Sequence, residues 1–538
     1  MLSRFAAGAP LRAARPILPI LAVALLALPA AAADRPEWTS AFNRDVAVKP
    51  GQKVEVDHSH GNVVVQGGSG SELRIAARIR VSAETLDEAQ RFGSAIEIRV
   101  EEAATAVRVR TVYPQGRYRN VSFSVDYDLG MPQTAALELN NSFGKVTVSG
   151  IKAGGVVKNS HGPLVLSDGQ GAQRLENAFG SIEVARVAGD VTVTNANGEV
   201  SASAIEGALS VTNRFGRVVA KAVRKTVSIT NANGDVDLQD AGGATINSSF
   251  GAVSVATVGG DLGVTNKNGR VAARSIVGAA TVRNGFGAVE LRDVGGRAQV
   301  ENANGAVTLN DVRGDAVAST SFGPLEVGQV KGALTATSAN GAISIREIGG
   351  DTSVQGSFGR IEVANLKQGA RILAANGEVA VSDVTGTAYV KTSFGQVRAE
   401  RVSGGLRVEN ANAAVRVSAI KGGAEVRTSF GPVTLEDVAG TVDVRNQNGA
   451  VELALAATKP CSVTVVTSFA PIRVSVPDGL GLSLTSSTSF GSIRSDLPVT
   501  ATGTFGKESL TGTVAGGGCP VSLTNQNGDI ELRRATPR

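Results

Sequence analysis

Residues 430–449 read FGPVTLEDVAGTVDVRNQNG, and this stretch shows the unit from which most of the chain is built. It opens with Phe430-Gly431, closes with Asn448-Gly449, and carries apolar residues at every second position in between. Alternation with a period of two is typical of a half-buried β-strand, and glycine permits the backbone conformations of a sharp bend. The stretch therefore predicts two short strands joined by two bends, without a helical period.

Glycine-closed corners of this kind recur at steps of 18 residues, with one step of 17 between Gly234 and Gly251. The residue before the glycine alternates between Phe and Asn. The Phe-Gly corners close at Gly144, Gly180, Gly216, Gly251, Gly287, Gly323, Gly359, Gly395 and Gly431, and the Asn-Gly corners at Gly198, Gly234, Gly269, Gly305, Gly341, Gly377 and Gly449. A fixed period of this length predicts a stacked repeat architecture.

Strands this short cannot bury an apolar face alone, so stacking of successive units must cover it. We therefore expect an all-β chain folded as a right-handed parallel β-solenoid, or β-helix. An 18-residue rung would lay each Phe on an Asn, whereas a four-strand rung of 36 residues would stack Phe on Phe and Asn on Asn. Because like-on-like ladders are favourable, we expect 18-residue half-units to pair into 36-residue rungs. Duplication of a 36-residue gene segment would explain the same alternation without such ladders.

The first 33 residues have the order of a secretory signal peptide. Three arginines precede an apolar run over residues 17–28, and small residues follow as far as Ala33. We expect cleavage before Asp34, and an uncleaved amino-terminal anchor is the alternative. Loss of the three arginines lowers the net charge from +5 to +2. Because opposite charges are interspersed along the rest of the chain, we expect no nucleic-acid partner.

We expect capping segments on both sides of the repeats, because the open end of a solenoid exposes unpaired strand edges. Residues 83–93 read as a short amphipathic helix with Ser82 as its N-cap. The expected segments are a signal peptide over 1–33, an amino-terminal capping region over 34–135, regular repeats over 136–455, and irregular repeats with a cap over 456–538.

Cys461 and Cys519 are the only cysteines. In an exported protein such a pair indicates a disulfide, and two unrelated buried thiols are the alternative.

Few residues suggest chemistry. His58 and His60, with Asp57 as a third ligand, are a weak metal candidate, and His60 and His161 stand before glycines where other units carry Asn. Paired carboxylates can act as general acid and base, but here they alternate with buried positions or lie at bends, as solvated residues do. The carboxylates considered are Asp235, Asp237, Asp240, Asp311, Asp315, Glu436 and Asp437. We therefore expect no catalytic, cofactor or metal site.

The corner pattern Phe-Gly-x-Val-x-Val and Asn-Gly-x-Val-x-Val resembles that of the bacterial putative adhesin family, with a toastrack-type β-solenoid. The stretches at 54–65, 127–129 and 523–532 resemble the family as well, so the resemblance covers residues 42–533. It implies the fold and carries over no catalytic residue. Asn412-Ala413 departs from the Asn-Gly corner and predicts an altered bend.

We expect an exported, non-enzymatic, adhesin-like scaffold, located in the periplasm or at the cell surface. It would present a repetitive surface that binds a polymer or a protein of the cell envelope. A polysaccharide-active β-helix enzyme is the first alternative, and Asp, Glu, Lys or Arg clustered in one groove across several rungs would favour it. An envelope-stress signalling scaffold is the second alternative.

Overall fold

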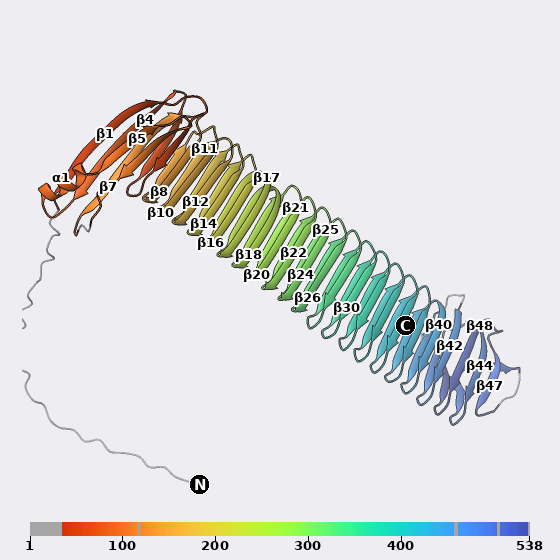
Figure 1. Ribbon diagram of the computed structural model, residues 1–538. Coiled ribbons are helices and arrows are strands. Elements are labelled where there is room, and N and C mark those ends of the chain that lie inside the picture. The colour runs from red at the N-terminus through yellow and green to blue at the C-terminus, as the bar shows by residue number, and fades with distance from the viewer. Residues whose placement is uncertain (1–34, 117–118, 457–460, 503–505, 536–538) are drawn as a thin grey trace, which may run out of the picture.

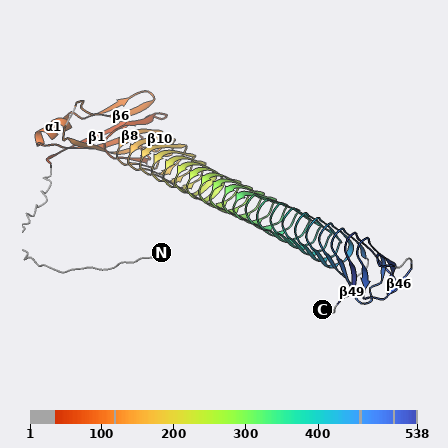
Figure 2. The same ribbon diagram turned by 90° about the horizontal axis from the view of Figure 1, so that it is seen from below.

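The structure is a computed structural model that describes residues 35–116, 119–456, 461–502 and 506–535. The expected signal peptide over residues 1–33 and its cleavage before Asp34 lie outside the described residues. The described chain forms a nearly straight rod of stacked coils in both perpendicular views (Figures 1 and 2). The parallel β-solenoid expected from the repeats is confirmed: about 19 turns stack along the rod, which corresponds to ~90 Å at the ~4.8 Å spacing of neighbouring strands.

One coil contains two strands, one in each of two facing parallel sheets. In the coil built from β22 (Ala280–Phe286) and β23 (Val289–Val294), the corner at Gly287 separates the strands. Alternate side chains of both strands, such as Val282 and Leu291, are buried between the sheets. A second bend follows β23 and returns the chain to the first sheet. The period-two pattern of the sequence therefore fills a thin core of Val, Leu, Ile and Ala.

The strands of the first sheet, which run toward the corners, are β8 (Leu137–Phe143), β10 (Gly155–His161), β12 (Gln173–Phe179), β14 (Val191–Asn197), β16 (Leu209–Phe215), β20 (Leu262–Asn268), β22, β24 (Ala298–Asn304), β26 (Ala316–Phe322), β28 (Leu334–Ser338), β30 (Thr352–Gly356), β32 (Ala370–Ala374), β34 (Ala388–Thr392), β36 (Leu406–Asn410), β38 (Ala424–Thr428), β40 (Gly440–Asn446) and β42 (Cys461–Thr467).

The strands of the second sheet, which follow the corners, are β9 (Val146–Ser149), β11 (Leu164–Gly169), β13 (Ile182–Val187), β15 (Val200–Ile205), β19 (Val253–Val258), β21 (Val271–Ile276), β23, β25 (Val307–Val312), β27 (Leu325–Val330), β29 (Ile343–Ile348), β31 (Ile361–Leu366), β33 (Val379–Val384), β35 (Val397–Val402), β37 (Val415–Ile420), β39 (Val433–Val438), β41 (Val451–Leu455) and β43 (Ile472–Val476). Two long strands, β17 (Val218–Asn233) and β18 (Val236–Phe250), run through both sheets.

The rung holds 18 residues, so the expected pairing of half-units into 36-residue rungs is wrong. Strand β22 pairs in parallel with β20 and β24, and this register places Phe286 beside Asn268 and Asn304. Phe and Asn therefore alternate along one column. The mixture is tolerated because these side chains point out of the core: Phe286 is 57% exposed. No buried site of fixed volume has to accept both residues.

At the amino-terminal end, the order of the strands in space differs from their order in the chain. Its elements are β1 (Glu37–Ala47), β2 (Lys53–Asp57), β3 (Val63–Gly68), β4 (Glu72–Ser82), α1 (Leu86–Ser94), β5 (Glu97–Glu102), β6 (Ala106–Val112) and β7 (Ser122–Pro132). Strands β2 and β3 pair with β8 and β9 and so form the first regular coil. The later strands β6 and β7 pair with β2 and β3 from outside. Antiparallel β4, β1 and β5 then complete this end.

The helix of this end starts later than the sequence suggested. It spans Leu86–Ser94, and its N-cap is Thr85, whose Oγ1 accepts a hydrogen bond from the Glu88 backbone N–H at 3.2 Å. Ser82, expected as the cap, instead ends strand β4. The acidic Asp87 and Glu88 of the first turn favour this start, because negative charge stabilises a helix N-terminus.

At the carboxy-terminal end, the order of the strands in space also differs from their order in the chain. Its elements are β44 (Leu482–Thr488), β45 (Ile493–Ser495), β46 (Val499–Ala501), β47 (Ser509–Val514), β48 (Cys519–Asn525) and β49 (Ile530–Arg534). The last two strands lie between earlier ones: β48 pairs with β42 and β44, and β49 with β43 and β45. Antiparallel β47 and β46 lie outside β44.

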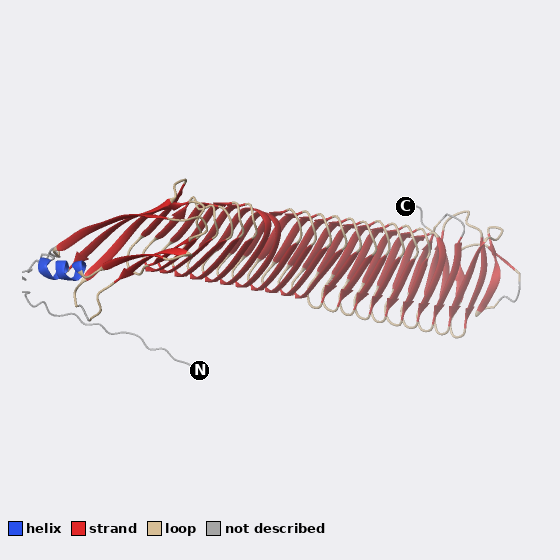
Figure 3. Ribbon diagram, turned by 45° about the horizontal axis from the view of Figure 1, so that its top comes forward, coloured by secondary structure: helices blue, strands red, loops and turns tan. Residues whose placement is uncertain are grey.

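The corners change in the second half of the rod. The first-sheet strands are seven residues long up to β26 and five from β28 to β38, and Figure 3 shows the added loops along that edge. Thr, Ser, Gly or Ala replaces most of the inward asparagines here. The Asn412-Ala413 corner belongs to this half, and Asn410 Nδ2 still donates to the Ala413 carbonyl at 3.0 Å.

Candidate functional site

A buried ladder of asparagines ties the corners together. Asn284 Nδ2 donates to the carbonyl of Gly287 in its own corner at 3.1 Å and to that of Gly269 in the preceding coil at 3.2 Å. Equivalent bonds to two corner carbonyls recur at Asn159, Asn195, Asn213, Asn231, Asn266, Asn410 and Asn446. These side chains satisfy backbone groups, so we assign them a structural role.

The phenylalanines of the corners form an exposed row, which we call the Phe edge. Its members are Phe143, Phe179, Phe215, Phe250, Phe286, Phe322, Phe358, Phe394, Phe430 and Phe469, with exposed fractions between 45% and 63%. Corner asparagines lie between them, and all but Asn304 bond to the preceding coil, as Asn340 Nδ2 does to the Ser321 carbonyl at 3.1 Å. Sequence reasoning explained this column by packing and missed its exposure.

A row of residues with positive φ runs along the opposite edge, at the bend that ends each second-sheet strand. Asp293, Asp311, Glu347 and Asp383 have φ between 53° and 61°. Left-handed backbone is uncommon outside glycine and is best tolerated by Asn and Asp. The repeated Asp and Asn six residues after a corner were the available sequence signal for this row.

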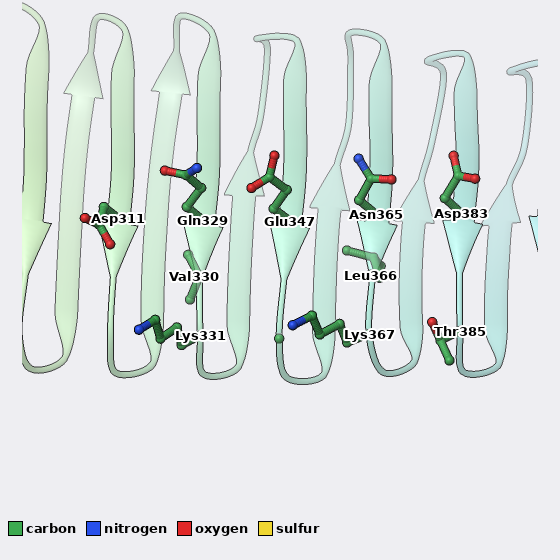
Figure 4. Close-up of a pocket in the computed structure, with 11 residues that line it drawn as sticks. Asp311, Gln329, Val330, Lys331, Glu347, Asn365, Leu366, Lys367, Asp383 and Thr385 are labelled. Carbon is green, nitrogen blue, oxygen red and sulfur yellow. The ribbon is translucent and has the colours of Figure 1, made fainter.

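A shallow groove of about 940 Å³ follows this row across several coils, and we call it the lysine groove. Figure 4 shows two lines of side chains along it. One line contains Asp311, Gln329, Glu347, Asn365 and Asp383, and the other contains Lys331, Lys367 and Thr385. Within the described segments, neither lysine forms an ion pair, whereas Asp383 pairs with Arg401 at 2.7 Å, which lowers the pKa of that carboxyl.

The other carboxylates found in the sequence serve the fold. Asp235 Oδ1 accepts a hydrogen bond from the Ala252 backbone N–H at 2.8 Å, and Asp315 Oδ1 accepts one from Ala333 at 2.9 Å. Asp237 pairs with Arg217 at 2.7 Å. Asp240 and Asp437 occupy the positive-φ row, next to Glu436 in the second case. Of the sequence candidates, only Asp311 lies in the lysine groove.

The three histidines do not converge on a metal position. The His58 ring is buried with Nδ1 3.1 Å from Thr111 Oγ1, and burial lowers its pKa to about 4. Asp57 faces outward and accepts from Asn140 Nδ2 at 3.0 Å. His60 stacks on Phe143, and burial lowers its pKa as well. No three His, Cys, Asp or Glu side chains in the described part of the chain are placed to hold a metal ion.

Cys461 and Cys519 form a disulfide in the structure, with their Cα atoms 5.3 Å apart. They begin the neighbouring strands β42 and β48, so the bond joins the last chain segment to the coil on which it packs. No helix in the described segments is long and apolar enough to cross a membrane.

The sequence matches no protein-family model and no curated protein. Among solved structures, a putative cell adhesion protein from Clostridium sporogenes is 12% identical, with a TM-score of 0.17, and the match covers 39% of this chain and all of that one. A putative adhesin from Parabacteroides distasonis is 12% identical, with a TM-score of 0.15 over 64% of this chain and 97% of that one.

Proposed function

We propose that the chain is an exported, non-enzymatic scaffold of the adhesin type that binds an extended polar polymer of the cell envelope along the lysine groove. The lysine groove carries this proposal, because it offers a row of carboxylates and amides on consecutive coils beside lysines on every second coil. Such rows suit a ligand that itself repeats along its length. The stacked sheets hold the rows rigidly, so little ordering of the protein opposes binding.

The test is retention of the protein on immobilised envelope polysaccharides and on purified peptidoglycan, at low and at high salt. The variant Lys331→Gln/Lys367→Gln removes both ammonium groups of the groove. We expect at least about a tenfold loss of affinity for an acidic polymer at low salt and a smaller loss at high salt, because salt screens exposed charges. Retention on none of these polymers at either salt concentration would contradict the proposal.

The matched control is Lys421→Gln. Lys421 lies in the same column as Lys331 and Lys367, at the same place in its coil, but outside the groove. This control removes one ammonium group from the same kind of bend, against two in the test variant. We expect its affinity to equal that of the unchanged protein.

A polysaccharide-active enzyme is the second candidate, because carboxylates and lysines do share one groove. Asp311 and Glu347 are 36 residues, or two coils, apart, which places their backbones ~9.6 Å apart. The carboxyl groups of inverting glycosidases lie about 6.5–9.5 Å apart, so this spacing lies just beyond the upper end of that range. Glu347 is also exposed and Asp311 only half-buried, whereas a general acid is usually buried. Release of reducing ends from a bound polymer, lost in Glu347→Gln, would replace the scaffold proposal with this one.

A further inference from the structure

Apart from ring contacts of Phe143 and Phe179 with His60 and His161, and of Phe215 with Arg214, the Phe edge has no aromatic or cationic partner within the described chain. It is not part of the lysine groove. Ten phenylalanines line it, each about half exposed. A contiguous apolar surface of more than a few hundred Å² marks an interaction site on most soluble proteins. The edge is also straight, because the coils stack without a kink in either of two perpendicular views (Figures 1 and 2).

The Phe edge has the shape of a comb. Successive phenylalanines lie two coils apart, or ~9.6 Å at ~4.8 Å per coil. The residue between two of them is the shorter Asn, as Asn304 is between Phe286 and Phe322. An aromatic ring placed above Asn304 would therefore lie ~4.8 Å from each neighbouring ring, inside the 4.5–7 Å range of favourable aromatic pairs.

The chain itself contains one gap filled in this way. His161 replaces Asn between Phe143 and Phe179, and its ring lies 4.6 Å from the first ring and 4.9 Å from the second. The three rings are nearly parallel, with interplanar angles of 14° and 11°. A ring in a gap of the comb is thus compatible with the spacing and backbone of this rod.

We propose that two copies of the chain associate through their Phe edges, with the phenylalanines of each copy entering the gaps above the corner asparagines of the other. The ~9.6 Å spacing of the phenylalanines favours a second copy of the chain as the partner. An α-helix repeats every 5.4 Å and a strand face every ~6.7 Å, so neither follows the comb. A polyproline helix repeats every ~9.3 Å and would drift by ~3 Å over ten corners. A second copy has the same period and stays in register.

The buried area suits a stable dimer. A phenylalanine buries at least ~150 Å² when fully enclosed. Ten half-exposed rings therefore offer roughly 800 Å² per copy, which is about the contribution of each partner to a standard interface. The asparagine amides between the rings keep the floor of each gap polar and set the depth to which a ring can enter.

Symmetry favours an antiparallel pair. A two-fold axis perpendicular to the rod, midway between a Phe corner and the adjacent Asn corner, places the Phe positions of one copy opposite the Asn positions of the other; only the gap already filled by His161 takes no ring. A two-fold axis along the rod would instead set Phe tips against Phe tips. The antiparallel arrangement is closed and isologous, so association stops at two chains. It also leaves both lysine grooves, which lie on the opposite edges of the coils, accessible.

Sedimentation equilibrium of the purified protein tests the dimer. We expect twice the mass of one chain at micromolar concentrations, with no further growth. The variant Phe286→Asn/Phe322→Asn/Phe358→Asn should raise the dissociation constant at least about 100-fold, because three anchors are removed from the centre of the interface. Asn already occupies the alternate corners, so the fold accepts this change. A monomeric unchanged protein, or a variant that dimerises equally well, would overturn the proposal.

The variant Asn304→Phe distinguishes association by interdigitated rings from nonspecific hydrophobic association. Asn304 has no side-chain hydrogen-bond partner among the described residues, and the substituted ring repeats the stack seen at His161. It fills one gap, so an interlocking partner must lose contact and the dissociation constant should rise about tenfold. A fall in the dissociation constant would show that added apolar surface alone drives association, and the proposal would be wrong. Far-ultraviolet circular dichroism checks that both variants keep their strands.

Discussion

At the level of single residues, each corner depends on contacts that cross from one coil to the next. Gly287 has a φ of +110°, and a Cβ at this position would lie 2.4 Å from the Gly269 carbonyl oxygen. Asn284 donates to that same carbonyl from inside the core. The identity of a corner residue is therefore set by the neighbouring coil as well as by its own backbone.

Replacement of this glycine should be costly. We expect Gly287→Ala to lower the free energy of unfolding by about 2–4 kcal/mol, because it adds a clash with backbone to an unfavourable φ. Urea denaturation followed by circular dichroism measures the loss. The control is Gly70→Ala, since a Cβ at Gly70 has no atom within 4 Å. Equal stability of the two variants would show that the coils can separate locally without cost.

At the level of elements, the strands could be predicted because each is short, alternating and closed by glycine. The coil size could not, because the alternation of Phe and Asn is the same for 18- and 36-residue rungs. The wrong choice assumed that Phe286 and Asn304 compete for packing space, and the structure shows that both face outward. The exposure of the Phe edge could not be predicted for the same reason.

The elements that form the candidate site were only partly predictable. Asp311 was found as a carboxylate at a bend, but Lys331 and Lys367 were not singled out. Their grouping depends on the 18-residue register, which places residues 36 apart on every second coil. The order of strands at the two ends could not be predicted either, because spacing along the chain does not reveal which strand edge receives an inserted segment.

The first coil also contains a buried titratable group. His58 lies on the inner side of the chain after β2, where its ring meets Thr111 and Tyr127 from the coil formed by β6 and β7. Its pKa of about 4 lies below the ordinary 6.5 because burial disfavours the charged form. The neutral ring is thus part of the contact between the first coil and the cap.

This contact should weaken in acid. As pH falls below about 6.5, the unfolded chain binds a proton at His58, but the folded chain does not until about pH 4. The stability of this end should therefore fall by about 3 kcal/mol across that window and change no further from this group below it. Hydrogen exchange of β2 and β6 at pH 7 and pH 4.5 measures the effect. The variant His58→Leu should abolish this loss of stability. If the stability of the variant depends on pH as strongly as that of the unchanged protein, other groups cause the effect.

At the level of the whole molecule, the rod is a chain of nearest-neighbour contacts whose ends are closed out of sequence. In such a solenoid, damage to one coil spreads mainly to adjacent coils. The disulfide between Cys461 and Cys519 lies where the final segment packs on β42. It should therefore stabilise the carboxy-terminal coils far more than the amino-terminal ones.

Reduction of this bond should loosen one end only. Closing a loop of 58 residues is worth about 4 kcal/mol in the chain-entropy model. We expect Cys461→Ser/Cys519→Ser to expose residues beyond β42 to limited proteolysis while the coils up to β26 stay protected. Mass spectrometry of the fragments locates the cuts, and the unchanged protein with its bond intact is the control. Uniform cleavage along the rod would contradict the nearest-neighbour account.

The out-of-order ends also determine how such a protein can change in length during evolution. Strands β48 and β49 follow β42 to β45 in the chain, yet they lie inside the stack between these earlier strands. At the other end, β6 and β7 likewise lie between the earlier strands β2 to β5. Repeats added or lost next to these inserted strands would therefore disrupt the strand pairing that closes that end of the stack. Only internal coils can be duplicated or deleted in whole 18-residue steps, each of which changes the length by ~4.8 Å and leaves both ends intact.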